Sequence, residues 1–227
     1  DKIPLKQNII YGPVHSRRLG KSLGINLTPL GKKVCSFDCV YCQYGKTEIK
    51  ARTYDPRQAP SPELIRDSLE RTLENLSEDP DYLTFSGNGE PTLHPEFEKV
   101  IEVVRKARDK HSEAKIALLS NSSKVNEPDT LTSINKIDVP IMKLDVGSPE
   151  KFELINRPSE IKFAEVIEGL NRIENLRIQS LKFRGEFENM GRDIKDWAEI
   201  VGDLQPKEVQ IYSLDRPSRF DLEKVEK

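Results

Sequence analysis

The sequence predicts an α/β fold built around a parallel sheet. Hydrophobic residues follow two periods along the 227-residue chain: short β-prone runs, and stretches with an apolar residue at every third or fourth position. These two kinds of segment alternate, which is the pattern of βαβ units with helices covering the sheet. With 36% hydrophobic residues spread over the whole length, the chain can bury a core, and we expect one domain over residues 1–227.

Six segments have the character of strands. They are residues 22–27, 81–86, 115–119, 139–144, 176–183 and 209–214. The helices predicted between them cover residues 61–76, 95–110, 128–134, 163–170 and 194–204. The first helix has the clearest start, with Ser61 as cap and Pro62 in the first turn. Six strands are too few to close an eight-stranded barrel, and in such folds the chemistry gathers at the carboxyl ends of the strands.

Composition excludes some classes of protein and favours others. No apolar run approaches the ~20 residues that cross a bilayer, and no signal-peptide pattern opens the chain, so we expect a cytoplasmic protein with no membrane partner. The net charge of −2 does not indicate a nucleic-acid binder. However, residues 1–52 hold ten Lys and Arg against three Asp and Glu, whereas the remainder holds 26 against 35. The start of the chain is therefore basic.

All three cysteines lie in this basic segment, as Cys35, Cys39 and Cys42 in the spacing CxxxCxxC. Disulfides would leave one thiol unpaired and close very small loops. A zinc site would need a distant histidine. Three thiolates on one short loop suit a four-iron four-sulfur cluster, because soft sulfur ligands favour iron-sulfur chemistry. One iron then has no protein ligand.

This spacing, with the aromatic residue Tyr41 just before the last cysteine, resembles the signature of the radical S-adenosylmethionine (radical SAM) superfamily. The resemblance implies an open, partial (β/α)6 barrel, with a lead-in and first strand over residues 1–34, a cluster loop over 35–45 and the other βα units over 46–227. It implies that S-adenosylmethionine (SAM) binds the open iron through its amino and carboxylate groups. An external one-electron reductant then drives cleavage of SAM to methionine and a 5′-deoxyadenosyl radical, which abstracts hydrogen from a substrate.

The resemblance also assigns cofactor contacts to loops that follow strands. Gly87-Asn88-Gly89-Glu90 is similar to the Gly-Gly-Glu motif that meets the amino group of SAM. Since the middle residue departs from that motif, the backbone of Asn88 and Gly89 is an alternative to Glu90 itself. Tyr41 is expected near the adenine. Polar contacts to the methionine carboxylate and ribose are expected from Asn121, Lys143 and Asp145. Ordinary turns, helix caps and a solvated lysine are the alternatives for these loops.

Three further stretches, residues 11–20, 155–158 and 209–217, are similar to a group of prokaryotic iron-sulfur oxidoreductases near the tRNA wyosine synthases. Wyosine synthases use a second cluster on additional cysteines, which this chain lacks. The substrate is therefore open between a tRNA base and a small or peptidyl molecule. Arginines are candidates for an anionic substrate group, and the alternative is ion pairs that tie the ends of the barrel together. They are Arg17, Arg18, Arg184 and Arg216.

Two other classes of protein stay open. An electron-transfer protein with a cluster but no SAM chemistry predicts a fourth cysteine, which is absent, and gives no use to the glycine-rich loop. A zinc-stabilised binding module does not need six βα units.

Overall fold

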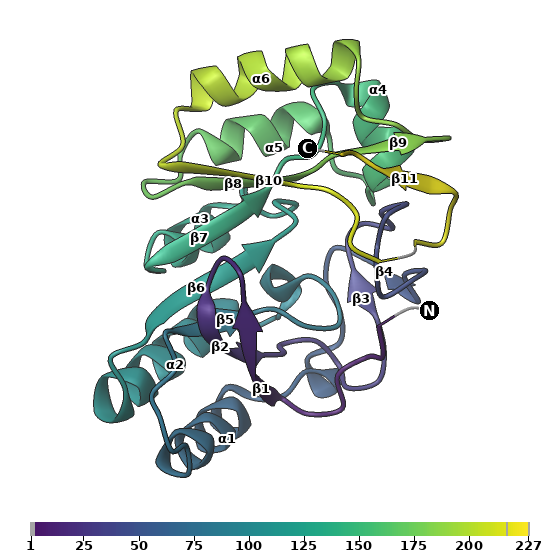
Figure 1. Ribbon diagram of the computed structural model, residues 1–227. Helices are drawn as coiled ribbons and strands as arrows, with labels where there is room; N and C mark the ends of the chain where they lie inside the picture. The colour runs from purple at the N-terminus through teal and green to yellow at the C-terminus, as the bar shows by residue number, and fades with distance from the viewer. Residues whose placement is uncertain (1–2, 217, 227) are drawn as a thin grey trace.

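The computed structural model describes residues 3–216 and 218–226, which form a mostly parallel sheet of seven strands in the order β1-β2-β5-β6-β7-β8-β10 (Figure 1). All neighbours from β2 to β10 run parallel, and β1 pairs antiparallel with β2 at one edge. The strands are β1 Ile10–Ser16, β2 Gly20–Ile25, β5 Tyr82–Phe85, β6 Lys115–Ser120, β7 Val139–Lys143, β8 Arg177–Leu181 and β10 Glu208–Tyr212. The six predicted strands are confirmed, and β1 is an addition.

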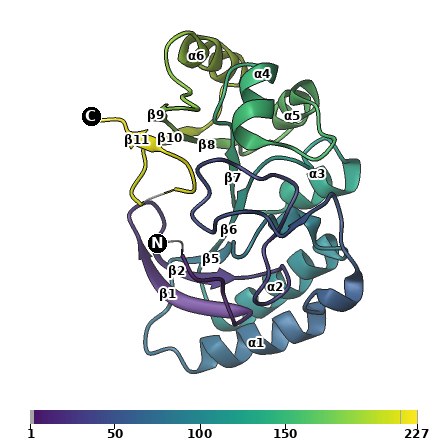
Figure 2. The same ribbon diagram turned by 90° about the vertical axis from the view of Figure 1, so that its right-hand side faces the viewer.

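Helices follow the parallel strands and cover the outside of the sheet. They are α1 Pro62–Glu74, α2 Phe97–His111, α3 Pro128–Ile134, α5 Phe163–Leu170 and α6 Arg192–Leu204. Figure 2 shows them one after another around an arc, from α1 at the bottom to α6 at the top. Ser61 caps α1 by accepting a hydrogen bond from the backbone of Leu64, and Pro62 stands in the first turn, as the sequence predicts. The predicted α/β fold with a parallel sheet is confirmed as an open arc.

The two faces of the sheet differ in chemistry because successive side chains of a strand point to opposite faces. On β2, Leu23 and Ile25 are fully buried in the main core cluster, which includes residues of α1, α2 and α5. The neighbouring Ser22 points to the inner, concave face, where its hydroxyl lies 2.7 Å from that of Thr84 on β5. The inner face is therefore polar in its first strands.

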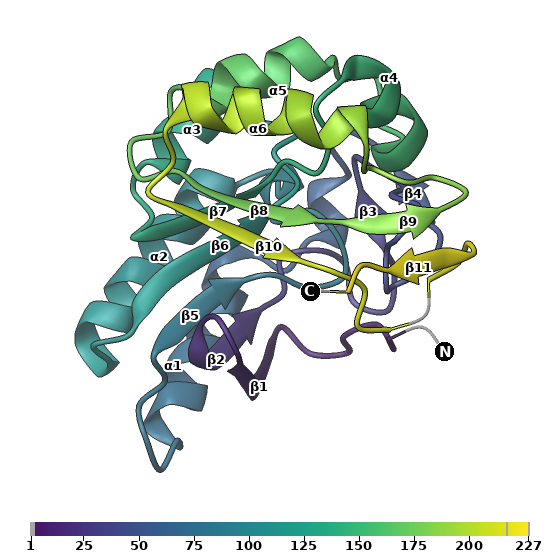
Figure 3. The ribbon, with the colours of Figure 1, turned by 45° about the horizontal axis from the view of Figure 1, so that its top comes forward.

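Two small two-stranded sheets lie beside the main one (Figure 3). In one, β3 Val34–Cys35 pairs with β4 Ile49–Lys50; in the other, β9 Phe183–Gly185 pairs antiparallel with β11 Leu222–Lys224. The predicted strand 176–183 is thus too long, because β8 ends at Leu181. Arg184 is not at the end of the fifth parallel strand, as the sequence suggested, but in the middle of β9.

The remaining short elements include one irregular helix that the sequence did not predict. The 3-10 turns Pro56–Gln58 and Pro91–Leu93 precede α1 and α2. The short helix α4, Pro149–Lys151, continues directly into a π-helix, Phe152–Asn156. Within the described residues, no helix has the length and apolar character needed to cross a membrane.

Candidate functional site

The three cysteines lie on one loop that the rest of the chain holds from both sides. Cys35 ends β3, and all three thiols are free and partly buried. The end of the π-helix and the segment after it lie along the loop: the Val40 amide donates to the Ile155 carbonyl at 2.9 Å, and the Ser159 amide donates to the Ser36 carbonyl at 2.9 Å. The loop is therefore positioned by main-chain hydrogen bonds.

A buried lysine fastens the far end of the same loop. Lys33 is only 2% exposed, and its ammonium donates to the Gly45 carbonyl at 2.6 Å. Burying a lysine is costly unless its charge has a partner. Lys33 lies near enough to Cys35 to favour the thiolate form of that cysteine. The basic start of the chain thus contributes one positive charge inside the site.

The electrostatics of the thiols fit a metal centre. Burial raises the pKa of Cys35, and it raises the pKa of Cys39 to about 11, with a further increase from neighbouring cysteines in each case. Three thiols crowded in this way become thiolates when positive metal charge offsets their repulsion. In the described part of the chain, no three His, Cys, Asp or Glu side chains have the arrangement of a single-ion site. A cluster differs because each thiolate binds a different iron.

On one side, Cys35 is surrounded by amide and hydroxyl groups. The Asn121 side-chain amide lies 3.4 Å from Cys35 Sγ and donates to Ser36 Oγ at 2.9 Å. Ser36 in turn donates to Ser123 Oγ at 2.6 Å. Asn121, expected to contact the cofactor, is thus placed against Cys35, one of the predicted cluster ligands.

The loop after β5, Gly87 to Glu90, is largely occupied by contacts within the chain. The Asn88 side chain pairs with the backbone of Lys6 at 2.6 and 2.8 Å, and Gly87 lies against the side chain of Asn26. A Cβ on Gly89 would stand 1.6 Å from the Val34 carbonyl oxygen, so only glycine allows β3 to approach this closely.

Glu90 is likewise saturated. Its carboxylate accepts hydrogen bonds from the Asn121 amide at 2.6 Å and from the hydroxyls of Ser120 and Thr92 at 2.8 and 2.6 Å. Burial raises the pKa of Glu90, and these donors act in the opposite direction. The Glu90 side chain is therefore engaged within the chain, and contact with SAM through this side chain or through the backbone of Asn88 and Gly89 stays a prediction.

The other side of the loop carries charge. The Tyr41 hydroxyl donates to Asp145, which is 2% exposed and forms an ion pair with Lys143 at 2.8 Å. Lys143 also contacts the Tyr212 hydroxyl at 2.9 Å. The Asn156 amide lies 3.5 Å from Cys39 Sγ. Tyr41 of the cluster loop and Lys143 and Asp145 at the end of β7, all three predicted to contact the cofactor, are brought together here.

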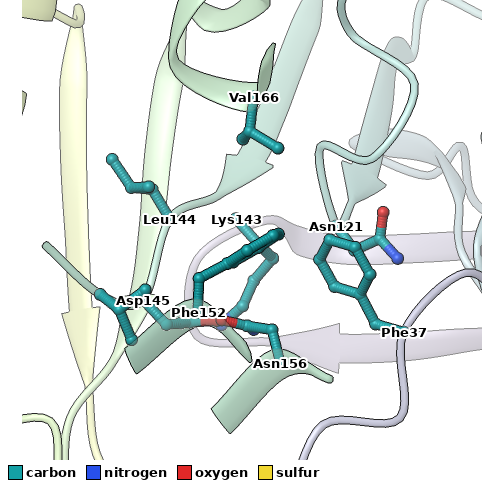
Figure 4. A pocket seen from close by; sticks show the side chains of 9 residues that line it. Phe37, Asn121, Lys143, Leu144, Asp145, Phe152, Asn156 and Val166 are labelled. Carbon is teal, nitrogen blue, oxygen red and sulfur yellow. The ribbon is translucent and has the colours of Figure 1, made fainter. Parts of the chain in front are cut away.

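Part of this group lines a small cavity shown in Figure 4, between the cluster loop and α5. Asn121, Lys143, Asp145 and Asn156 supply its polar wall. Its apolar wall consists of Phe37, Leu144, Val146, Phe152 and Val166.

The charge states in this group follow from burial and from the ion pair. Burial lowers the pKa of Lys143, but Asp145 and Tyr212 outweigh it and raise the pKa overall, so the lysine stays protonated. Burial raises the pKa of Tyr41, and the nearby Asp145 raises it further, which keeps the phenol neutral and able to donate. The site therefore holds one ammonium and one neutral phenol around a carboxylate.

A second cavity lies on the inner face of the sheet between β1, β2, β5 and β6. Its wall is formed by Tyr11, Val14, Ser16, Leu19, Ser22, Gly24, Thr84, Ser86 and Leu119. The Tyr11 hydroxyl lies 2.6 Å from that of Ser86, at the carboxyl end of β5. Tyr44 of the cluster loop lies near both Tyr11 and Cys42. Burial is the main cause that raises the pKa of Tyr44, and the charges of Tyr11 and Cys42 raise it further. This cavity thus adjoins the cysteine loop.

The four arginines proposed for substrate lie elsewhere. Arg17 forms an ion pair with Asp215 at 2.5 Å, with side chains 83% and 56% exposed, and the Arg18 guanidinium lies 4.4 Å from the centre of the Tyr212 ring. Both contacts join the β1–β2 turn to the end of β10 across the open side of the sheet. Arg17 and Arg18 therefore have the kind of contact expected if these arginines connect the two ends of the barrel instead of binding a substrate.

Arg184 and Arg216 are both exposed, and among the described residues neither shares an ion-pair partner with Arg17 or Arg18. Arg216 lies near Tyr44, whereas Arg184 lies on β9.

Sequence reasoning missed Asn156 and Tyr212 as site residues. Both fall in stretches singled out by their similarity to the oxidoreductase group, residues 155–158 and 209–217, of which residue 217 lies outside the described residues. The similarity singled out these stretches, but it did not identify which of their side chains point into the site.

Comparison with known proteins supplies the family. The sequence profile of the Radical SAM superfamily matches residues 32–198. This chain belongs to the Radical SAM superfamily. The matched residues include all three cysteines and every strand from β3 to β8.

Relatives and solved structures agree with this assignment. A UPF0026 protein of Helicobacter pylori is 30% identical over 222 residues, which are 96% of this chain and 70% of the relative. A structure of TYW1 with a lysine-pyruvate adduct bound has a TM-score of 0.57 at 16% identity, covering 86% of this chain and 65% of that one. A structure of anSMEcpe with bound AdoMet has a TM-score of 0.63 at 18% identity, covering 89% and 55%. The resemblance to the radical SAM superfamily seen in the sequence is confirmed, and the two structures support the fold.

Proposed function

We propose that this chain is a radical SAM enzyme that holds one four-iron four-sulfur cluster through Cys35, Cys39 and Cys42, with SAM at the iron that has no protein ligand. One observation carries the proposal: a loop with three thiols is docked beside the buried pair of Lys143 and Asp145. The fold likeness to a SAM-bound protein, anSMEcpe, supports it.

When cluster and SAM are bound and an external one-electron reductant is present, they supply a 5′-deoxyadenosyl radical by reductive cleavage of SAM to methionine. The residues of the chain bind, orient and exclude water. The Lys143 ammonium suits a carboxylate, and the Asp145 carboxylate suits hydroxyl or ammonium hydrogens. The Tyr41 ring, packed 5.8 Å from that of Phe183, presents an aromatic surface for a purine.

The cavity between β1 and β6 suits the substrate. Its polar groups are hydroxyls, from Tyr11, Ser16, Ser22, Thr84 and Ser86, and the described residues that line it include no charged side chain. Hydroxyls donate and accept hydrogen bonds with uncharged partners. We therefore expect an uncharged polar group at this position, such as a nucleobase edge or a peptide amide. A tRNA base and a peptidyl or small molecule both meet this requirement.

Anaerobic reconstitution with iron and sulfide tests the proposal. We expect the loaded protein, with SAM and dithionite, to release 5′-deoxyadenosine, measured by liquid chromatography and mass spectrometry. Omission of dithionite is the control and should abolish the product. A protein that binds the cluster but yields no 5′-deoxyadenosine under reduction would instead support the electron-transfer alternative. A protein that binds no cluster would overturn the metal assignment.

A further inference from the structure

Asn156 occupies an unusual backbone position. It is the last residue of the π-helix Phe152–Asn156, and the next residue, Arg157, is left-handed with φ of 50°. Single π-turns interrupt the regular α-helical geometry and occur often at functional sites. Here the turn aims the Asn156 side chain at the cysteine loop, while its own carbonyl accepts from the Asp38 amide at 3.1 Å. The residue is thus held against the loop from its backbone.

The Asn156 side-chain amide meets three acceptors in a dry environment. The residue is 4% exposed, and its Nδ2 lies 3.5 Å from Cys39 Sγ, 3.3 Å from the Tyr41 hydroxyl and 3.3 Å from Asp145 Oδ2. A side-chain amide has two hydrogens to donate. Asn156 therefore joins a proposed cluster ligand to the charged group that faces the cofactor.

A hydrogen bond to a ligand sulfur has a known electrostatic consequence. It stabilises negative charge on the cluster, and the reduced cluster carries one more negative charge than the oxidised one. A donor at Cys39 therefore favours the reduced form and raises the reduction potential. Because the Asn156 environment is buried, water does not replace the lost donor when the amide is removed.

We propose that Asn156 is a positioning residue that raises the reduction potential of the cluster by donating to Cys39. This inference rests on the function proposed above. In the step it affects, the external reductant loses one electron and the cluster gains it. Asn156 neither binds iron nor touches the reacting atoms of a substrate; it sets how readily that electron is accepted.

The test compares midpoint potentials of reconstituted protein by EPR-monitored redox titration without SAM. Asn156→Leu keeps approximately the same side-chain shape but cannot donate. We expect its potential to be lower, with about a tenfold change in the ratio of oxidised to reduced cluster at a fixed potential, which is 59 mV for one electron. The matched control is Asn126→Leu, because Asn126 is a partly buried amide that bonds instead to Glu168 and Arg172; its potential should equal that of the parent.

Equal potentials for Asn156→Leu and the parent overturn the inference while leaving the proposed function intact. Absence of a cluster from the parent overturns both. If Asn156→Leu does not load, Asn156→Ala provides a second donor-free variant, checked by iron content and circular dichroism. Failure of both variants to fold or to hold a cluster shows that Asn156 maintains the site rather than its potential, and so contradicts the inference.

Discussion

The two sides of the cysteine loop are built from different chemistry. The side chains that hydrogen-bond around Cys35 are neutral, with Asn121 and Ser36 joined to Ser123, whereas the charges of Lys33 and Glu90 act on this thiol only through space. Around Cys39 they include an ion pair, since Asn156 reaches Asp145, which pairs with Lys143. The neutral side is complete in itself, whereas the charged side has groups that can exchange partners with a ligand. The proposed function thus predicts that the first side maintains the loop and the second receives the cofactor.

Two of the buried carboxylates, one on each side, illustrate this difference. Glu90 and Asp145 are each 2% exposed. Glu90 accepts only from neutral donors, which connect the ends of β5 and β6. Asp145 accepts from the Tyr41 hydroxyl and the Leu181 amide and balances the charge of Lys143. Because Asp145 is paired with an ammonium, that ammonium can turn from Asp145 to an incoming anionic group.

The largest effect is expected from removing a thiol, because the proposed cluster needs all three cysteine ligands, on both sides of the loop. Cys42→Ala should reduce bound iron and 5′-deoxyadenosine to the level of unreconstituted protein, measured by iron analysis and mass spectrometry. Ser36→Ala, which changes a neighbour of Cys35 but no ligand, should retain the cluster. A Cys42→Ala protein with a full cluster would show that the ligand assignment is wrong.

The carboxylates allow a direct comparison of the two sides. Asp145→Asn leaves the Lys143 charge buried without its partner and should lower the free energy of unfolding by about 3–5 kcal/mol. Glu90→Gln removes a carboxylate charge whose hydrogen bonds come from neutral donors, and it should lower the free energy of unfolding by about 1–3 kcal/mol. Urea unfolding of the metal-free proteins measures both.

SAM binding sharpens the same comparison. The double variant Asp145→Asn with Lys143→Met removes the unpaired charge and should recover part of the lost stability but not SAM binding, measured by equilibrium dialysis of loaded protein. Glu90→Gln should bind SAM within about threefold of the parent, a difference below 1 kcal/mol. Weak binding by Glu90→Gln and normal binding by the double variant would reverse the roles of the two sides.

Behind Asp145, a buried lysine makes stability depend on pH. Lys182 is 3% exposed, donates to the Asp145 carbonyl at 2.9 Å and lies 4.1 Å from the Trp197 ring centre; burial lowers its pKa to about 8. The folded protein thus loses this proton near pH 8, whereas the unfolded chain keeps it to about pH 10.5. Since the unfolded state binds more protons in that window, this lysine should increase stability with rising pH, by about 3 kcal/mol in total.

Lys182→Met removes this contribution. The difference in unfolding free energy between parent and variant should change in favour of the parent from pH 8 to 10, measured by urea unfolding. Lys195→Met, at an exposed position on α6, is the control and should give curves parallel to the parent. Parallel curves for Lys182→Met as well would show that the lysine titrates normally.

The smallest effect is expected at the open side of the sheet. Arg17→Ala breaks an exposed ion pair with Asp215 and should change the free energy of unfolding by less than about 0.5 kcal/mol. Formation of 5′-deoxyadenosine without substrate should also be unchanged. A loss above about 1 kcal/mol would mean that the contact between the β1–β2 turn and β10 contributes more to the fold than exposed pairs usually do.

The sequence was sufficient for the parallel core because each buried strand and each helix carries its own local period. It was insufficient for β1, whose residues Ile10–Ser16 are mostly exposed and include Gly12 and Pro13, so that no alternating pattern marks an edge strand. The π-helix was missed because the whole helix from Pro149 to Asn156 is short and gives little helical period, although Ser148 caps its start.

For the site, the cysteines and the positions of the loop residues were predictable because their signals are local. Their partners were not. Asn156 is 117 residues from Cys39, and Tyr212 is 69 residues from Lys143, so only the folded chain shows these pairs. The sequence also could not show that the side chains of Glu90 and Asn88 form hydrogen bonds within the chain.

Gly89 has a consequence for how the metal centre is assembled. With the Val34 carbonyl at its Cα and the Glu90 amide donating to that same oxygen at 3.1 Å, the strand that ends in Cys35 is seated on the barrel by polypeptide alone. If the three cysteines hold the proposed cluster, this backbone packing fixes where the first of them lies. We therefore expect a bulkier residue at position 89 to reduce iron loading even though all three cysteines remain.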